Sequence, residues 1–348
     1  MSKSSKYDPG EPKTMYTMKY LVKRVLLYVL TLFLAITINF IVPRLIPGNP
    51  IEARLAALYR LGVHIGGEEF VAKYSKLFAL DQPMYVQFFL YLSNLIQGNM
   101  GFSILYFPAS VMDILMRGLP WTIGLLSVTV IMSFAGGLVL GAFMGWTNRE
   151  GKVSRWTSFV FTIFMLLSRF PFFLLGMILV YVFTYTLFLF PYGGGVDPQA
   201  IPGTIEYIVS ILQHATLPAL SIVLAQLGGW AIEARGLMVN VLGEDYLFLA
   251  KAKGLKERYI FRQYAMKNTT LPILTDLVIA LGSIASGAIL VEIVFSYPGI
   301  GSLLYMSVMQ LDYPMIQAVS LLVVFGVTTA ALLIDLVYPF LDPRVGEK

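Results

Sequence analysis

Four residues whose side chains or position could serve a functional site lie in or beside long apolar segments: Arg169, Pro171, Glu233 and Glu292. A charged side chain is costly to bury in a membrane, so such residues line solute paths or pair with one another. Arg169 is therefore a candidate for contact with an anionic or hydroxyl-rich solute. Two alternatives stay open: Arg169 pairs with Glu233 or Asp276, or its side chain reaches the membrane surface from a tilted helix.

The sequence lacks the patterns of common catalytic and metal sites. Cysteine is absent, which excludes disulfides, thiolate metal sites and cysteine nucleophiles. No G-x-S-x-G, H-E-x-x-H or paired-aspartate pattern points to an intramembrane enzyme, and no G-x-x-x-x-G-K-[ST] loop is present to hold nucleotide phosphates. His64 and His214 are far apart in the sequence. We therefore expect neither a metal site nor an ATPase in this chain.

The composition is that of an all-α polytopic membrane protein. Hydrophobic residues make up 57% of the 348 residues and charged residues only 13%, and the mean hydropathy is +0.74. A bilayer core of about 30 Å requires about 20 helical residues per span, so the chain can hold several spans. The net charge of +5 comes from Lys and Arg beside the apolar runs. It therefore reflects contact with membrane lipid and topology, and we expect no nucleic-acid partner.

The apolar runs predict about six membrane-spanning helices. After a polar tail at 1–20, the first span lies at 21–42, and a core at 120–340 holds the other five, followed by a tail at 341–348. We place those five at 120–146, 156–190, 217–238, 272–295 and about 314–338. The run at 156–190 is too long for one straight span and is broken at Arg169 and Pro171, so we expect one kinked or tilted helix. We expect Pro120 and Pro272 in first helical turns, which accept proline.

The segment between the first two spans and the distribution of charge predict the topology. Residues 43–119 contain many turn residues and predict a small extracytoplasmic domain with short helices, one of them after Pro83. Lys and Arg gather in the N-terminal tail, after the second span, around 235–267 and at the C-terminus, whereas 191–216 and 296–313 have none. Cytoplasmic loops carry the excess of positive charge, so we expect both termini in the cytoplasm of a multi-pass cell (inner) membrane protein.

The most charged segment, within 240–271, predicts a helical hairpin on the cytoplasmic side. Asp245 would begin a short helix, with Lys251 and Lys253 near its end, where these charges oppose the helix dipole. Gly254 would stop the helix in a left-handed turn, and apolar spacing resumes at Ile260 on a second helix. By charge spacing alone, the hairpin is either a docking element for another protein or a solvated loop.

The hairpin and several other segments resemble one family. DYLFLAKAKGL and FRQYAMKNTTLP are similar to the cytoplasmic EAA-type loop of ABC importer permeases of the dipeptide and oligopeptide type, in the first-permease (B-type) form. PRLIPGNP, LDQPMYVQFFLYLSNLIQGNMGFS, VEIVFSYPGIGSLL, LDYPMIQA and IDLVYPFLDPRV resemble further segments of that family, in the same order along nearly the whole chain.

The resemblance implies a type I ABC importer permease core and a role for the hairpin. Its first helix would be the coupling helix that docks on a cytoplasmic ATPase subunit. The motif positions fall on Asp245, Tyr246, Ala250, Ala252, Gly254 and Pro272, with Lys251 and Lys253 beside them. The implied partners are a homologous second permease (a heterodimer), two ATPase subunits that bind ATP and Mg, and an extracytoplasmic solute-binding protein. This chain itself would bind no cofactor.

The same resemblance leaves the solute and some roles open. Peptides, oligosaccharides and nickel complexes are all carried within the family. Glu292 matches a family position, where it would contact solute, pair with a neighbouring subunit or cap the PGIG turn. Arg169 departs from the family, which places an apolar residue there. A secondary transporter driven by an ion gradient is the alternative of another class, and ATP dependence of uptake separates the two.

Overall fold

Long helices dominate the computed structural model, which describes residues 18–45, 50–60, 67–77, 79–148, 155–282 and 289–341. Within these ranges the regular elements are helices, apart from one isolated bridge between Phe102 and Ser110. The longest are α1 (Met18–Arg44), α5 (Val111–Asn148), α8 (Ile205–Leu242) and α14 (Tyr313–Leu341). Each contains a segment long and apolar enough to cross a membrane. The predicted all-α polytopic class is confirmed.

The number of candidate spans among the described residues is four, or five if a bent pair of helices counts as one span. That pair joins Arg155–Leu167 to Phe172–Thr186 at an angle of 105°, so the kink predicted at Arg169 and Pro171 is present. The span predicted at 272–295 corresponds to α11 (Lys267–Gly282) and α12 (Ile289–Val294). Residues 283–288 between them lie outside the described part of the chain.

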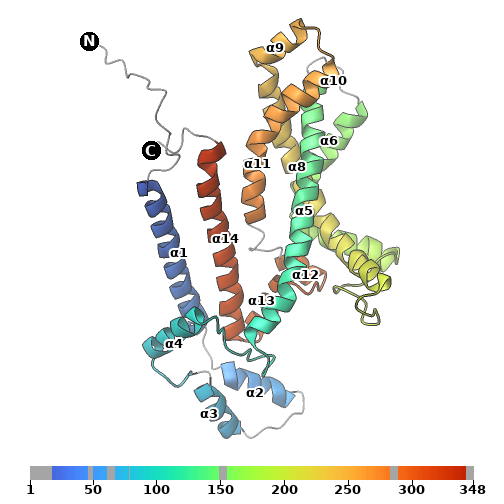
Figure 1. The fold of residues 1–348 in the computed structure, drawn as a ribbon. Coiled ribbons are helices and arrows are strands. Elements are labelled where there is room, and N and C mark those ends of the chain that lie inside the picture. The colour runs from blue at the N-terminus through green and yellow to red at the C-terminus, as the bar shows by residue number, and fades with distance from the viewer. Residues whose placement is uncertain are drawn as a thin grey trace, which may run out of the picture.

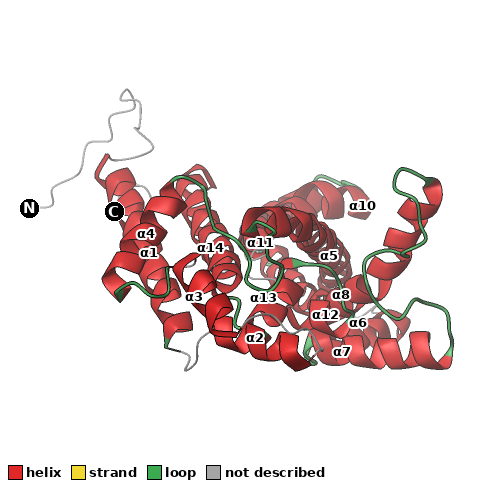
Figure 2. Ribbon diagram, turned by 90° about the horizontal axis from the view of Figure 1, so that it is seen from below, coloured by secondary structure: helices red, strands yellow, loops and turns green. Residues whose placement is uncertain are grey.

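The helices form two groups (Figure 1). In the first, α1 packs along α14. In the second, α5 lies along α8, and α6 (Arg155–Leu167) and α7 (Phe172–Leu179) also pack against α8. Seen from below, α1 and α14 lie together on the left and α5 and α8 lie together to their right (Figure 2). A Cβ at Gly141 would collide with the backbone of Ala231, so small residues let α5 and α8 approach closely.

Several helices begin earlier than their prolines predict, and these expectations were wrong. α5 begins at Val111, because the Ser110 hydroxyl accepts the backbone N–H of Asp113 (3.1 Å). Pro120 and Pro272 therefore lie inside α5 and α11. Membrane helices tolerate internal proline because neighbouring groups satisfy the backbone that it frees.

α8 also begins early, at Ile205, where the Thr204 hydroxyl accepts the N–H of Tyr207 (3.2 Å). Pro218 is thus internal as well. The loop expected at 191–216 is correspondingly shorter, because its second half is helical.

Short helices occupy the region between the first two long ones. These are α2 (Pro50–Arg60), α3 (Gly67–Leu77) and α4 (Met84–Ile96), which begins directly after Pro83 as the sequence predicts. They lie at the end of the molecule opposite α9 (Figure 1). The buried Asp312 carboxylate accepts the N–H groups of Ile104 (3.1 Å) and Leu105 (3.0 Å) and the Ser103 hydroxyl. This contact ties the segment before α5 to the start of α14.

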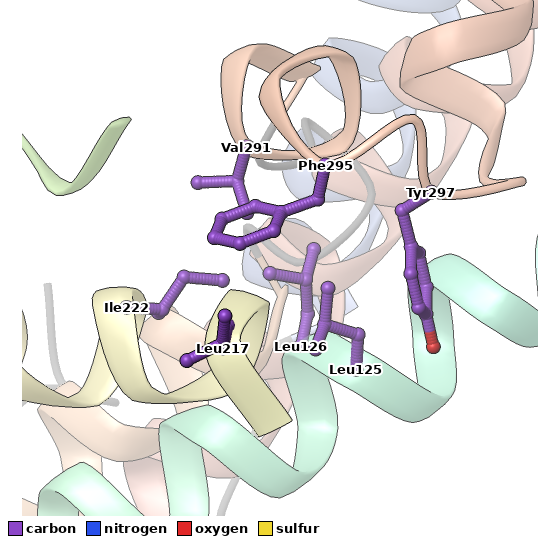
Figure 3. Close-up of a cluster of buried hydrophobic side chains, with 7 residues drawn as sticks. All are labelled: Leu125, Leu126, Leu217, Ile222, Val291, Phe295 and Tyr297. Carbon is purple, nitrogen blue, oxygen red and sulfur yellow. The ribbon is translucent and has the colours of Figure 1, made fainter. Parts of the chain in front are cut away.

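A buried apolar cluster fixes α12 against α5 and α8 (Figure 3). Its members are Leu125, Leu126, Leu217, Ile222, Val291, Phe295 and Tyr297. The Tyr297 ring meets Trp121 of α5 edge to face, with 5.6 Å between centroids. The cluster positions the PGIG turn, which follows Tyr297, next to α5.

Candidate coupling hairpin and translocation cavity

The charged hairpin has the predicted turn at Gly254. α9 (Asp245–Ala252) begins and ends within one residue of the predicted bounds. Gly254 has φ of 72°, in the left-handed region, and its N–H bonds to the Lys251 carbonyl (2.8 Å). Glycine adopts this conformation without the steric penalty that most residues with a β-carbon incur. Asp245 lies in the first turn and Lys251 in the last, where their charges oppose the helix dipole.

The chain after the turn forms one continuous helix, which corrects the expectation of a separate third helix at Pro272. α10 (Glu257–Ile260) runs through the π-helical segment η2 (Phe261–Met266) into α11. Because no break separates them, a displacement of the hairpin passes directly into α11.

A buried core joins the hairpin to the long helices. It consists of Leu247 and Ala250 from α9, Ile260 and Ala265 from the following helix, Ala142 from α5 and Met238 from α8. All six side chains are at most 3% exposed. Since protein interiors transmit displacement through close packing, the hairpin is mechanically coupled to the ends of α5 and α8.

The outer face of α9 is apolar and uncovered. Phe248 is 74% exposed and Leu249 is 59% exposed, and Lys251 and Lys253 are exposed beside them. Large exposed apolar side chains rimmed by polar residues mark interaction sites. Figure 1 places α9 at one extremity of the molecule, where a partner could reach this face.

Tyr246 connects the inner side of α9 to α11. Partial burial raises the pKa of the Tyr246 phenol, the Glu244 carboxylate adds to the rise, and a hydrogen bond with Asn268 opposes it. The phenol is therefore neutral at physiological pH and bonds to the start of α11.

The break between α6 and α7 presents Arg169 to an open space. Tight turns end α6, with the Arg169 N–H bonded to the Leu166 carbonyl (3.0 Å), and Pro171 directly precedes α7. A Cβ at Gly228 of α8 would collide with the Phe164 carbonyl and lie 2.8 Å from the Ser168 Cβ. This close approach holds the end of α6, and hence Arg169, over α8.

Arg169, Glu233 and Asp276 line one cavity of about 590 Å³. The remaining lining residues are Val130, Ser168, Ala225, Gln226, Gly229, Trp230, Ile232 and Ala280. Arg169 and Asp276 are exposed and Glu233 is half-buried. Among the described residues, no ion pair within 4.0 Å links Arg169 to an acid.

Glu292 lies away from this cavity and holds the PGIG turn. It is fully buried. Its carboxylate accepts the Thr122 hydroxyl (2.6 Å) and the N–H groups of Gly301 (2.7 Å) and Ser302 (3.1 Å). It thus caps α13 (Ile300–Met309), one of the three roles that its sequence position allows.

The structure brings two of the four predicted path residues together, Arg169 and Glu233. Pro171 shapes the break beside the cavity without lining it, and Glu292 is elsewhere. Sequence reasoning missed Gln226 and Trp230 as lining residues, and nothing in their local sequence singles them out. It also missed Asp312, although LDYP was one of the segments that carried the resemblance.

Comparison with known proteins shows the family of this chain. Residues 137–347 match the family described as "Binding-protein-dependent transport system inner membrane component". The chain belongs to this family. It is a multi-pass inner membrane protein and the permease component of an ABC importer, without an ATPase domain.

Relatives match over nearly the whole chain. The probable D,D-dipeptide transport system permease protein DdpB of Escherichia coli (strain K12) is 33% identical over 89% of this chain and 92% of its own length. The oligopeptide transport system permease protein AppB of Bacillus subtilis (strain 168) is 30% identical over 94% of this chain and 98% of its own. The glutathione transport system permease protein GsiC of Escherichia coli (strain K12) is 32% identical over 95% of this chain and all of its own.

Proposed function

We propose that this permease, with a homologous second permease, forms the path by which peptides cross the membrane through alternating access. Two cytoplasmic ATPase subunits would drive the cycle and bind ATP and Mg, and an extracytoplasmic binding protein would deliver the solute. This chain would bind no cofactor itself. The solutes named for the relatives, a D,D-dipeptide, oligopeptides and glutathione, favour peptides over oligosaccharides or a nickel complex.

The hairpin at α9 is the observation that carries this proposal. Its outer face exposes Phe248 and Leu249, and its inner face is buried against α5 and α8. An ATPase subunit that binds the outer face would therefore move the long helices when it closes on nucleotide. By this proposal Asp245, Tyr246, Ala250, Ala252, Gly254 and Pro272, with Lys251 and Lys253, form the coupling loop.

The proposed orientation places the hairpin and both termini in the cytoplasm. α1 begins and α14 ends toward the same end of the molecule as α9, and α2 to α4 lie toward the other end (Figure 1). The excess of positive charge around the hairpin favours the cytoplasm for that end. The binding protein would then meet the end that carries α2 to α4.

Substitution of Gly254 tests the coupling role. A Cβ at Gly254 meets nothing within 4 Å, so a side chain has room and only the left-handed backbone opposes it. We expect Gly254→Val to lower ATP-dependent uptake at least about fivefold, since a β-carbon costs about 1–2 kcal/mol in this conformation. Uptake is measured in proteoliposomes that hold the purified complex with its binding protein.

Two control variants separate coupling from assembly. Gly254→Asn should retain uptake, because asparagine tolerates the left-handed region. Gly243→Ala at the other end of α9 should also retain it, because Gly243 has φ of −82° and its Cβ would have an ordinary contact at 3.4 Å. Full uptake by Gly254→Val would contradict the proposal. Uptake that needs an ion gradient and no ATP would favour a secondary transporter.

A further inference from the structure

The cavity at the α6–α7 break carries opposite charges on different elements. The break supplies Arg169, α8 supplies Glu233, and α11 supplies Asp276. Gln226 and Trp230 of α8 lie between them in the lining. One cationic and two acidic side chains from three separate elements therefore line the same cavity.

The charges are not satisfied by one another. No ion pair reaches Arg169 from the acids among the described residues, although all three line the same cavity. Glu233 and Asp276 line the same cavity, and neighbouring carboxylates repel unless a cation or a proton lies between them. A ligand that offers an anion to Arg169 and a cation to the two acids would satisfy all three groups.

We propose that this cavity is a charge-selective subsite for zwitterionic solutes, with the solute carboxylate at Arg169 and its ammonium group at Glu233 and Asp276. The inference rests on the proposed permease function and adds a selection step in the membrane subunit. Arg169 would bind the carboxylate through two parallel hydrogen bonds, a geometry that the guanidinium group favours.

The size of the cavity fits a short peptide. Its volume of about 590 Å³ lies within the range of about 300–1,000 Å³ typical of small-molecule sites. Two extended residues span at most about 7 Å, which is the reach of a dipeptide inside this cavity. A neutral oligosaccharide would leave all three charges without a counter-charge, and a cationic metal complex would leave Arg169 without one.

The test compares three probes in the complete transporter. Purified wild-type and variant complexes, each with the same binding protein, are placed in proteoliposomes with ATP. The probes are radiolabelled dialanine, its C-terminal amide and its N-acetyl form. Any preference of the binding protein is the same for all permease variants, so it cancels when the uptake ratios of variants are compared.

Each variant should change one ratio. Arg169→Gln should lower dialanine uptake about tenfold, as expected for the loss of a charged hydrogen bond, and change uptake of the amide little. Arg169→Lys should restore part of the preference for a free carboxylate. The double variant Glu233→Gln with Asp276→Asn should remove the preference for dialanine over its N-acetyl form by a similar factor.

Two control variants carry the same types of substitution, Arg to Gln and Glu to Gln, at positions outside the cavity. Arg155→Gln at the start of α6 and Glu206→Gln in the first turn of α8 change exposed residues outside the cavity, and both ratios should stay at the wild-type value. Recovery of intact complex is measured for every variant, so a loss of assembly is separated from a loss of selection.

The possible negative results distinguish an error in the proposed subsite from an error in the proposed peptide transport. ATP-dependent uptake whose ratios are unchanged by Arg169→Gln and by the double variant overturns the subsite and leaves the permease function standing. Equal losses for all three probes in well-assembled variants also overturn it, because they indicate a role without charge selection. Absence of ATP-dependent uptake of any alanine peptide from two to five residues overturns the peptide function and the subsite together.

Discussion

Arg169 and Glu292 show how two charged residues in apolar sequence come to have different surroundings. Glu292 is fully buried, and its carboxylate accepts three hydrogen bonds from this chain. Arg169 is exposed in a cavity without an ion pair among the described residues. In the sequence both are single charges beside apolar residues, and the partners that give them different surroundings are distant. Thr122 is 170 residues from Glu292, and no local pattern links the two.

Replacement of Glu292 should destabilise the protein, because the first N–H groups of α13 would lose their hydrogen-bond acceptor. Glu292→Leu would leave the buried N–H of Gly301 and the half-buried N–H of Ser302 without acceptors, at a cost of about 2 kcal/mol or more. Glu292→Gln should cost less, because its carbonyl oxygen can still accept from both. Thermal unfolding of the purified protein measures the difference, with Glu206→Leu at an exposed site as control. Equal unfolding temperatures for Glu292→Leu and wild type would contradict the capping role.

Among the elements, the hairpin was predictable and the bounds of the long helices were not. Charge order and Gly254 determine α9 through local effects, the helix dipole and the left-handed turn. Proline misled the prediction for α5 and α11, because Ser110 caps α5 earlier and α10 continues through Pro272. The break at Arg169 was also predictable from composition, but its angle depends on how α6 packs against α8.

Two adjacent glycines of α8 test that packing. A Cβ at Gly228 would collide with the Phe164 carbonyl, whereas a Cβ at Gly229 meets nothing within 4 Å. We expect Gly228→Ala to destabilise the protein by about 1–3 kcal/mol, as overpacking does. Gly229→Ala should leave stability unchanged or raise it by up to about 1 kcal/mol, because alanine favours helix. Thermal unfolding of both variants is the measurement, and an equal loss of stability in both would contradict the close approach of α6 and α8.

For the whole molecule, the absence of cysteine allows a direct test of orientation. The proposed topology, which rests on the charge distribution, has the α9 hairpin in the cytoplasm and the loop before α8 outside. In the natural cysteine-free background, single cysteines report on one position at a time. Lys253→Cys lies beside the exposed face of α9, and Gln199→Cys lies in the exposed loop before α8. We expect a membrane-impermeant maleimide to label Gln199→Cys in intact cells and Lys253→Cys only after the membrane is opened.

The same experiment extends to the N-terminus and includes its own controls. Ser2→Cys should behave as Lys253→Cys does, because an even number of spans separates the N-terminal tail from the hairpin in the proposed topology. The unmodified protein should give no signal, and each variant is scored only if it retains ATP-dependent uptake. Labelling of Lys253→Cys in intact cells would place α9 on the outer side. An ATPase subunit could not reach it there, so the coupling role of the hairpin would fail even if transport itself were normal.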